Sequence, residues 1–245
     1  MRRIAALATC ATVAALATAG CGGLDLDAEE VRAVQSFPLA GTDLKIISSL
    51  GGVRVLPGAA GGDVEVERWV RGKAADQGNA SWSLRDGTLR LGADCNMVFG
   101  DCGARYHVKV PPGVRLSVDA ADGVILKDLP QDVDVVSRDR IQVSGTSGKL
   151  RLRSEGPITG DGLKSVNVRC RTADGAIDLS FAGTPAKLDL QSSDGRVTAA
   201  VPKGSYAVTA RSTDGSERSE IKSDPEAAGT IVARSGSGDV RILAR

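Results

Sequence analysis

The sequence predicts an all-β fold, a single-stranded β-solenoid with coils of about 16 to 23 residues. One short unit recurs along the chain. It consists of two apolar residues with one residue between them, a turn that contains Gly, and two more apolar residues with one residue between them. Leu188 and Leu190 precede Gly195 in this way, and Val197 and Ala199 follow it. The alternation has the period of a strand, and helical periodicity is nearly absent. The same apolar offsets recur around Gly51, Gly87, Gly175 and Gly238.

A β-sandwich is the alternative all-β fold, because regular short strands with turns between them also describe a sandwich. A sandwich gives no reason for the same four apolar offsets around each Gly. In the C-terminal half the turn centres are spaced by 17, 16, 19, 20, 20 and 23 residues, which favours stacked coils. These centres are Gly123, Arg140, Gly156, Gly175, Gly195, Gly215 and Gly238.

Residues 1–20 have the pattern of an export signal. Arg2 and Arg3 precede an uncharged run, Ile4 to Ala19, which is too short to span a bilayer. The segment Thr18-Ala19-Gly20-Cys21 resembles the lipobox of bacterial lipoproteins, in which small residues precede a Cys that becomes the lipidated first residue. This resemblance implies lipidation of Cys21 and attachment to the outer face of the cell membrane. The alternative is an ordinary secretory signal with an incidental Cys21.

Residues 21–36 are predicted to be a flexible tether, because they carry four acidic residues and few bulky apolar ones. The β-strand repeat domain is expected over residues 37–245. Within it, the segment from Gly58 to Gly113 is less regular, and there we expect longer hairpins or a wider N-terminal layer.

Cys95 and Cys102 are predicted to form a disulfide, since the chain is expected to enter an oxidising compartment. Zinc is the alternative, but there is no second Cys pair and the only His has no companion. The enclosed Met97, Val98 and Phe99 are the best sequence candidates for a contact surface. The alternative is a loop folded down over a face of the solenoid.

Two further side chains are assigned by strand alternation. Cys170 falls at the repeat position of Leu190 and Ala210, so it should point into the core as a small apolar residue. His107 alternates with Tyr106 and Val108 and should face solvent. No nucleophile-elbow sequence accompanies His107, and no catalytic residues are predicted.

The turns carry a Ser/Thr-x-Asp-Gly motif, at Thr172 to Gly175, Ser192 to Gly195 and Ser212 to Gly215. We expect Gly there to supply a positive φ, and Asp to hydrogen-bond the backbone two residues on. These turns and their short strands resemble the bacterial "putative adhesin" domain-of-unknown-function family over about residues 40–245. The resemblance implies a right-handed β-helix-like solenoid on an exported or membrane-attached protein, with no catalytic residues.

Three features of the late coils need separate explanations. Asp174, Asp194 and Asp214 are equally spaced and could stack as a carboxylate ladder that binds calcium, although ordinary turn chemistry is the simpler interpretation. Glu217 and Ser219 stand where apolar residues should follow Gly215, which predicts a frayed strand. The segment from Asp224 to Ala228 has the Asp cap and first-turn Pro of a short helix.

Composition limits the partners. Removal of the signal takes away Arg2 and Arg3 and leaves 29 basic against 30 acidic residues, a balance that indicates no polyanion or anionic membrane. Aromatic residues are 3% of the chain, too few for the stacking platforms of nucleic-acid binding. We therefore predict no nucleic-acid partner and no cofactor.

Together these features predict a lipid-anchored, non-catalytic envelope protein that acts as an adhesin or interaction scaffold. Its partner would be a cell-wall component, another surface component or an envelope protein. Two alternatives remain open: an accessory or sensor subunit of an envelope signalling system, and a polysaccharide-active β-helix enzyme. The second would need acidic residues converging in a groove.

Overall fold

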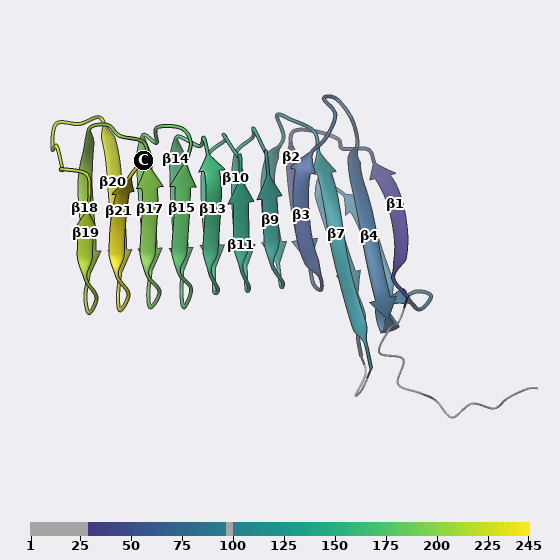
Figure 1. The fold of residues 1–245 in the computed structure, drawn as a ribbon. Coiled ribbons are helices and arrows are strands. Elements are labelled where there is room, and N and C mark those ends of the chain that lie inside the picture. Colours follow the sequence, from purple (N-terminus) through teal and green to yellow (C-terminus); the bar gives the residue numbers. More distant parts are fainter. Residues whose placement is uncertain (1–28, 97–99) are drawn as a thin grey trace, which may run out of the picture.

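The fold is all-β, with two long sheets that face each other across one apolar core (Figure 1). A computed structural model describes residues 29–96 and 100–245. In spatial order, sheet A contains β1 (Val31–Phe37), β4 (Val64–Gly72), β7 (Cys102–Val110), β3 (Gly52–Pro57), β9 (Val124–Lys127), β11 (Ile141–Ser144), β13 (Ile158–Leu163), β15 (Ile177–Phe181), β17 (Val197–Val201), β21 (Val240–Ala244) and β19 (Glu217–Ser219).

Sheet B has ten strands, and each central coil contributes one strand to each sheet. Its spatial order is β18 (Tyr206–Ser212), β20 (Gly229–Ser235), β16 (Lys187–Ser192), β14 (Asn167–Thr172), β12 (Leu150–Ser154), β10 (Val133–Ser137), β8 (Arg115–Ala120), β2 (Asp43–Ser48), β6 (Thr88–Ala93) and β5 (Ala80–Arg85). A 3₁₀ turn, η1 (Lys73–Ala75), follows β4. The predicted all-β, solenoid-like fold is confirmed.

Strand alternation builds the core. In β12 the residues Leu150, Leu152 and Ser154 are buried, and the two residues between them are exposed. Parallel in-register pairing aligns the same inward position in successive coils, so that Leu152 lies between Val135 and Cys170. Burial of these rows from both sheets is the main favourable term in folding.

The turns from sheet B to sheet A stack on one another through their Ser and Thr hydroxyls. The Ser192 Oγ donates to the carbonyl oxygen of Gly175 in the previous coil (2.8 Å) and accepts from the backbone N–H of Gly195 in its own turn (2.8 Å). Thr172 bonds Gly156 and Gly175 in the same way. The equivalent hydroxyls, nearly all buried, belong to Ser137, Ser154, Thr172, Ser192, Ser235 and Ser212.

The glycines of these turns are required for a different reason from the one expected. Gly175, Gly195, Gly215 and Gly238 do not have positive φ. A Cβ on Gly195 would instead lie 2.1 Å from the carbonyl oxygen of Gly175, and one on Gly175 would lie 2.3 Å from the carbonyl carbon of Gly156. Gly is therefore needed because successive turns approach too closely for any side chain.

The last two coils stack in the reverse of their order in the sequence. β20 and β21 lie between the β16–β17 coil and the terminal β18–β19 coil. All three residues of β19 are exposed, whereas Ile231, Val240 and Ile242 of the inserted coil are fully buried. The apolar coil occupies the inner position and the polar strand forms the edge, which agrees with the fraying predicted from Glu217 and Ser219.

The helix expected from Asp224 to Ala228 is wrong. This segment forms a turn, in which the Asp224 carboxylate accepts from the Glu226 N–H (3.1 Å) and the Ala227 N–H donates to the Asp224 carbonyl (3.1 Å). It connects β19 to β20, so it carries the chain from the terminal coil back to the inner one. One hydrogen-bonded turn suffices for this reversal and does not continue as a helix.

The N-terminal part is the wider, hairpin-containing layer that the irregular sequence predicts. β4 pairs antiparallel with β7, and β5 pairs antiparallel with β6 across the Asp86-Gly87 turn, where both residues have positive φ. β1 adds to the edge of β4, so the folded part begins at Val31 rather than at Phe37. Only Phe37 of β1 is buried, which explains why the hydrophobic pattern did not reveal this strand.

Replacement of Ser192 by Ala tests the turn stack. The loss of its hydroxyl leaves the Gly195 N–H and the Gly175 carbonyl without this partner, so we expect the free energy of unfolding to fall by about 1 to 3 kcal/mol. The matched control is the exposed neighbour, Ser193→Ala, with a change within about 0.5 kcal/mol. Urea denaturation followed by circular dichroism measures both, and equal effects would contradict the role of the stack.

Candidate ligand-binding groove

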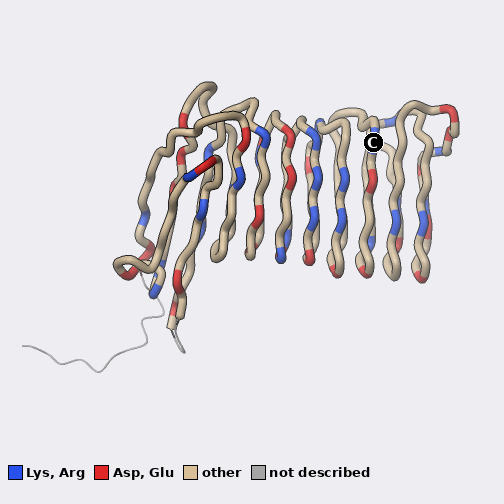
Figure 2. The backbone as a smooth tube through the Cα atoms, turned by 180° about the vertical axis from the view of Figure 1, so that it is seen from behind, with Lys and Arg blue, Asp and Glu red and all other residues tan. Residues whose placement is uncertain are grey.

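A groove of about 730 Å³ runs along the outer face of sheet B. It crosses seven strands, β2, β6, β8, β10, β12, β14 and β16, near the point where each begins. Outward-facing residues from successive coils form its lining because the coils are in register. Figure 2 shows charged residues recurring at similar heights along the strands of neighbouring coils.

Ion pairs between neighbouring strands line this groove. Arg115 contacts Asp43 at 2.8 Å, and Arg169 contacts Asp189 at 2.9 Å. Lys149 reaches Asp132 at 3.9 Å. These pairs are largely exposed, so each contributes little to stability, about 0 to 1 kcal/mol. Their side chains remain available to exchange partners with a bound polar molecule.

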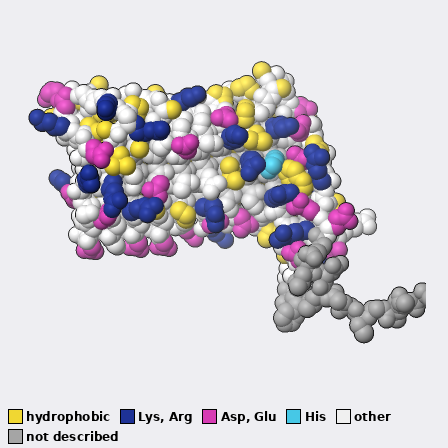
Figure 3. Space-filling model, viewed as in Figure 1, with side chains coloured by type: hydrophobic (Ala, Val, Ile, Leu, Met, Phe, Trp, Pro, Cys, Tyr) yellow, Lys and Arg dark blue, Asp and Glu magenta, His cyan; other side chains and the backbone are white. Residues whose placement is uncertain are grey.

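A second polar cluster covers the antiparallel part of sheet A. Trp69 of β4 packs edge-on against His107 of β7, with ring centroids 4.5 Å apart, and Arg105 lies 4.7 Å from the Trp69 ring centroid. The Arg32 guanidinium approaches the same ring and pairs with Glu67. Figure 3 shows the imidazole among basic and apolar side chains on this face.

His107 is therefore half-buried rather than freely solvated. Burial lowers its pKa below the usual 6.5, and the positive charges of Arg54 and Arg105 lower it further, against the opposing effect of Glu67. The imidazole is neutral at neutral pH. Its contacts explain it as part of a surface cluster around Trp69, not as a general base facing a cleft.

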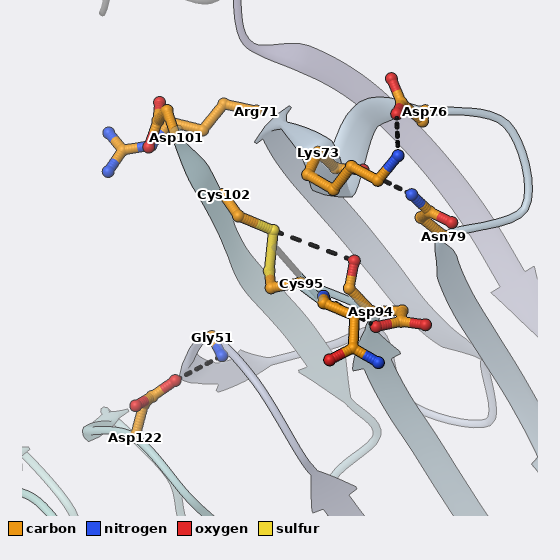
Figure 4. The surroundings of a disulfide bond; sticks show 11 residues. Gly51, Arg71, Lys73, Asp76, Asn79, Asp94, Cys95, Asp101, Cys102 and Asp122 are labelled. Carbon is orange, nitrogen blue, oxygen red and sulfur yellow. Dashed lines mark hydrogen bonds and ion pairs between the residues drawn. A yellow bond between two sulfur atoms is a disulfide. The ribbon is translucent and has the colours of Figure 1, made fainter. Parts of the chain in front are cut away.

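The structure contains the predicted disulfide between Cys95 and Cys102. It joins the segment after β6 in sheet B to the start of β7 in sheet A, so it ties the two sheets instead of closing a hairpin tip (Figure 4). Nearby, Arg71 pairs with Asp101 at 3.2 Å. The contact loop suggested by Met97, Val98 and Phe99 lies outside the described residues, and so does Cys21.

Cys170 points into the core as expected. It is fully buried and pairs in register with Leu190, at the position that Ala233 and Ala210 occupy in the next two coils. Burial raises the pKa of its thiol, so the reactive thiolate is strongly disfavoured.

The carboxylate ladder of Asp174, Asp194 and Asp214, the alternative to ordinary turn chemistry, does not form. The inserted β20–β21 coil separates Asp194 from Asp214, and Ser237 of that coil donates a hydrogen bond to the Asp194 carboxylate (3.0 Å). Over residues 29–96 and 100–245, no three His, Cys, Asp or Glu side chains gather closely enough to hold a metal ion. Equal sequence spacing was misleading because the coils are not stacked in sequence order.

The Toastrack DUF4097 family model matches residues 62–245, about three quarters of the chain. The chain belongs to the Toastrack DUF4097 family. This assignment agrees with the resemblance to the "putative adhesin" family of unknown function and with the solenoid-like fold. Comparison with curated proteins finds no match.

The solved structures that match this chain have very different sequences. A "putative adhesin" from Parabacteroides distasonis is 10% identical, with a TM-score of 0.54, and the match covers 89% of this chain and 98% of that one. This similarity shows the fold alone. A "putative cell adhesion protein" from Clostridium sporogenes is 11% identical over 89% of this chain and all of that one, with a TM-score of 0.41.

A "putative lipid binding protein" from Parabacteroides distasonis is also 11% identical. That match covers 86% of this Toastrack chain and 96% of the other, with a TM-score of 0.43. In the described part of this Toastrack chain, no helix is both long and apolar enough to cross a membrane.

Sequence reasoning missed the groove, because its lining comes from seven strands spread between Asp43 and Asp189. Alignment of the coils on their turn Ser and Thr residues would instead have revealed a row of basic residues outside the groove lining. The residue before the turn Ser or Thr is Arg in four coils of this Toastrack domain: Arg153, Arg171, Arg211 and Arg234.

Titration of His107 checks the cluster on sheet A. As the only His in the chain, it gives one imidazole signal by NMR, and we expect a midpoint below 6.5 that rises when Arg105 is replaced by Gln. Since the folded pKa is lowered, stability should be greater above pH 6.5 and fall as pH drops from 6.5 toward the folded pKa. A midpoint at or above 6.5 would contradict this packing.

Proposed function

We propose that this Toastrack protein is an exported, lipid-anchored, non-catalytic interaction protein of the cell envelope, and that its groove on sheet B binds an envelope component. The groove, which crosses seven strands and exposes ion-paired side chains throughout, is the observation that carries the proposal. A surface of this length suits an extended polar ligand held by many weak contacts.

The separation of apolar residues in the core from charged residues on the surface supports a binding role. The core is almost entirely apolar, and the buried Ser and Thr residues of the turns are committed to hydrogen bonds that stack the coils. Four of the groove's carboxylates, those of Asp43, Asp132, Asp134 and Asp189, pair with a basic residue of a neighbouring coil.

The attachment to the membrane rests on the sequence around Cys21. The uncharged run after Arg3 and the small residues before Cys21 support export and lipidation. A diacylated Cys would hold the protein durably at the membrane, since two acyl chains are needed for stable anchoring. The similarity of the fold to that of proteins described as adhesins is consistent with an extracellular role.

Replacement of Cys21 by Ala tests the anchor. We expect the variant to move from the membrane fraction to the soluble extracytoplasmic or medium fraction, because the acyl chains can no longer be attached. Immunoblots of fractionated cells measure this, with Cys170→Ala as the control because that thiol is buried in the core. Persistence of the Cys21 variant on membranes would contradict lipidation.

Blocking the groove tests the binding role. The mature chain, residues 22–245, should co-sediment saturably with purified cell-wall material. Ser117 faces outward within the groove, so Ser117→Trp should weaken this binding about tenfold or more by filling the groove. Calcium should have no effect, since the Asp ladder is interrupted by Ser237.

The matched control is Gln142→Trp, which adds the same side chain to the outer face of sheet A. We expect binding within about twofold of the unmodified protein, because the change lies on the opposite sheet. Loss of binding in the control alone would move the site to sheet A. Absence of binding in the unmodified protein would contradict a cell-wall ligand and favour a protein partner.

A further inference from the structure

Four arginines surround a small hollow beside the groove. Arg151 and Arg153 of β12 face Arg169 and Arg171 of β14, and the register places Arg151 directly opposite Arg169 and Arg153 directly opposite Arg171. With Leu152 they line a hollow of about 90 Å³. We call these four side chains the arginine quartet. Arg151 and Arg169 also line the groove, so the two hollows are adjacent.

The quartet carries more positive charge than its neighbours neutralise. Asp134 contacts Arg151 at 3.8 Å and Arg153 at 3.4 Å, and Asp189 contacts Arg169 at 2.9 Å. Among the described residues, Arg171 has no carboxylate within salt-bridge distance. Two carboxylates thus serve four guanidinium groups, and like charges directly opposite on neighbouring strands destabilise a sheet.

The fold itself does not require arginine in these places. The outward row that contains Arg153 and Arg171 continues with Val136 on one side and Gln191 on the other. Neutral side chains are therefore accommodated at the same position in adjacent coils. Two carboxylates offset the repulsion among the four guanidinium groups only in part, and a bound anion would relieve the remainder.

The guanidinium groups are accessible to a ligand. The side chains of Arg151, Arg153 and Arg169 keep 59%, 53% and 48% of their surface exposed. Beyond Gln191, the row of Arg153 and Arg171 resumes at Arg234 and then Arg211. Basic side chains therefore recur along the solenoid axis on both sides of Gln191, although Arg211 is paired with Glu217 at 3.6 Å.

We propose that the arginine quartet binds the phosphate groups of an extended anionic polymer that lies along the groove. This inference specifies the ligand of the proposed function and therefore rests on it. Arg guanidinium presents paired N–H donors that match phosphate oxygens bidentately. A polymer fits better than a membrane surface, because a chain can follow the groove into the quartet and a planar layer of headgroups cannot.

The near-zero net charge of the chain does not oppose this assignment. The balance between 29 basic and 30 acidic residues after removal of the signal describes the whole mature chain. The coil register gathers basic side chains on one part of sheet B, where they act on a ligand within about 10 Å, the screening length at moderate salt. Local arrangement, not total charge, determines what this face attracts.

Binding of fluorescently labelled inorganic polyphosphate to the mature chain, followed by anisotropy, tests the proposal. We expect saturable binding that is at least about tenfold tighter than binding of polygalacturonate, a carboxylate polymer, because bidentate pairing favours phosphate. Arg153→Gln combined with Arg171→Gln should weaken polyphosphate binding about tenfold or more. The corresponding double Lys variant keeps the charge but not the planar donors, and should bind with intermediate affinity.

The matched control is Arg54→Gln combined with Lys127→Gln. This pair removes the same charge from exposed positions on the outer face of sheet A, and should change the affinity less than about twofold. Thermal melting excludes unfolding as the cause: the quartet double variant should melt at or above the temperature of the unmodified protein, since like-charge repulsion is relieved.

Three outcomes would overturn the proposal. The first two are no saturable polyphosphate binding at low salt, and equal losses of affinity in the two double Gln variants. The third is binding of the protein to vesicles of equal parts phosphatidylglycerol and phosphatidylcholine from which polyphosphate cannot displace it. The last outcome would assign the quartet to a membrane surface. Cell-wall binding separates this inference from the proposed function. If the wall is bound but polyphosphate is not, only the inference fails; if neither is bound, both fail.

Discussion

The close stacking of the turns between the two sheets is the constraint on which the rest of this Toastrack structure depends. In four coils a turn hydroxyl accepts from a Gly N–H of its own turn and donates to a carbonyl of the adjacent turn, as Ser192 does with Gly195 and Gly175. The turns then lie so close that a Cβ on Gly195 would meet the Gly175 carbonyl oxygen at 2.1 Å. The motif therefore sets the distance and the register between coils, and the apolar rows of both sheets follow from that register.

Because the stack fixes only the contact between neighbouring turns, it does not require neighbours in space to be neighbours in sequence. The turn of Ser235 bonds Gly195, and the turn of Ser212 bonds Gly238, so the last coil of the chain enters the stack before the one that precedes it in sequence. The polar strand β19 is thereby left at the edge, where its exposed side chains cost little. At the other end, antiparallel strands and the Cys95–Cys102 disulfide complete the sheets.

The same register also determines the outer surface. Since inward and outward positions alternate, the outward rows are free of packing constraints and can carry any polar residue. In-register pairing then brings side chains about one coil apart in sequence, such as Arg153 and Arg171, directly opposite each other. A groove that is continuous over seven strands, and a local excess of positive charge within an almost neutral chain, both arise from this arrangement.

The sequence by itself determined the all-β fold, the coil length, the inward positions such as Leu190 and Cys170, and the frayed strand at Glu217, because alternation and turn motifs act over a few residues. Only the tertiary structure decided the edge strand β1, the exchange of the last coils, the separation of Asp194 from Asp214, and the assembly of the groove and the arginine quartet. These features depend on which distant segments become neighbours. That choice is made by the burial of entire coils and by backbone pairing at the edges, and neither is encoded in the pattern of any single segment.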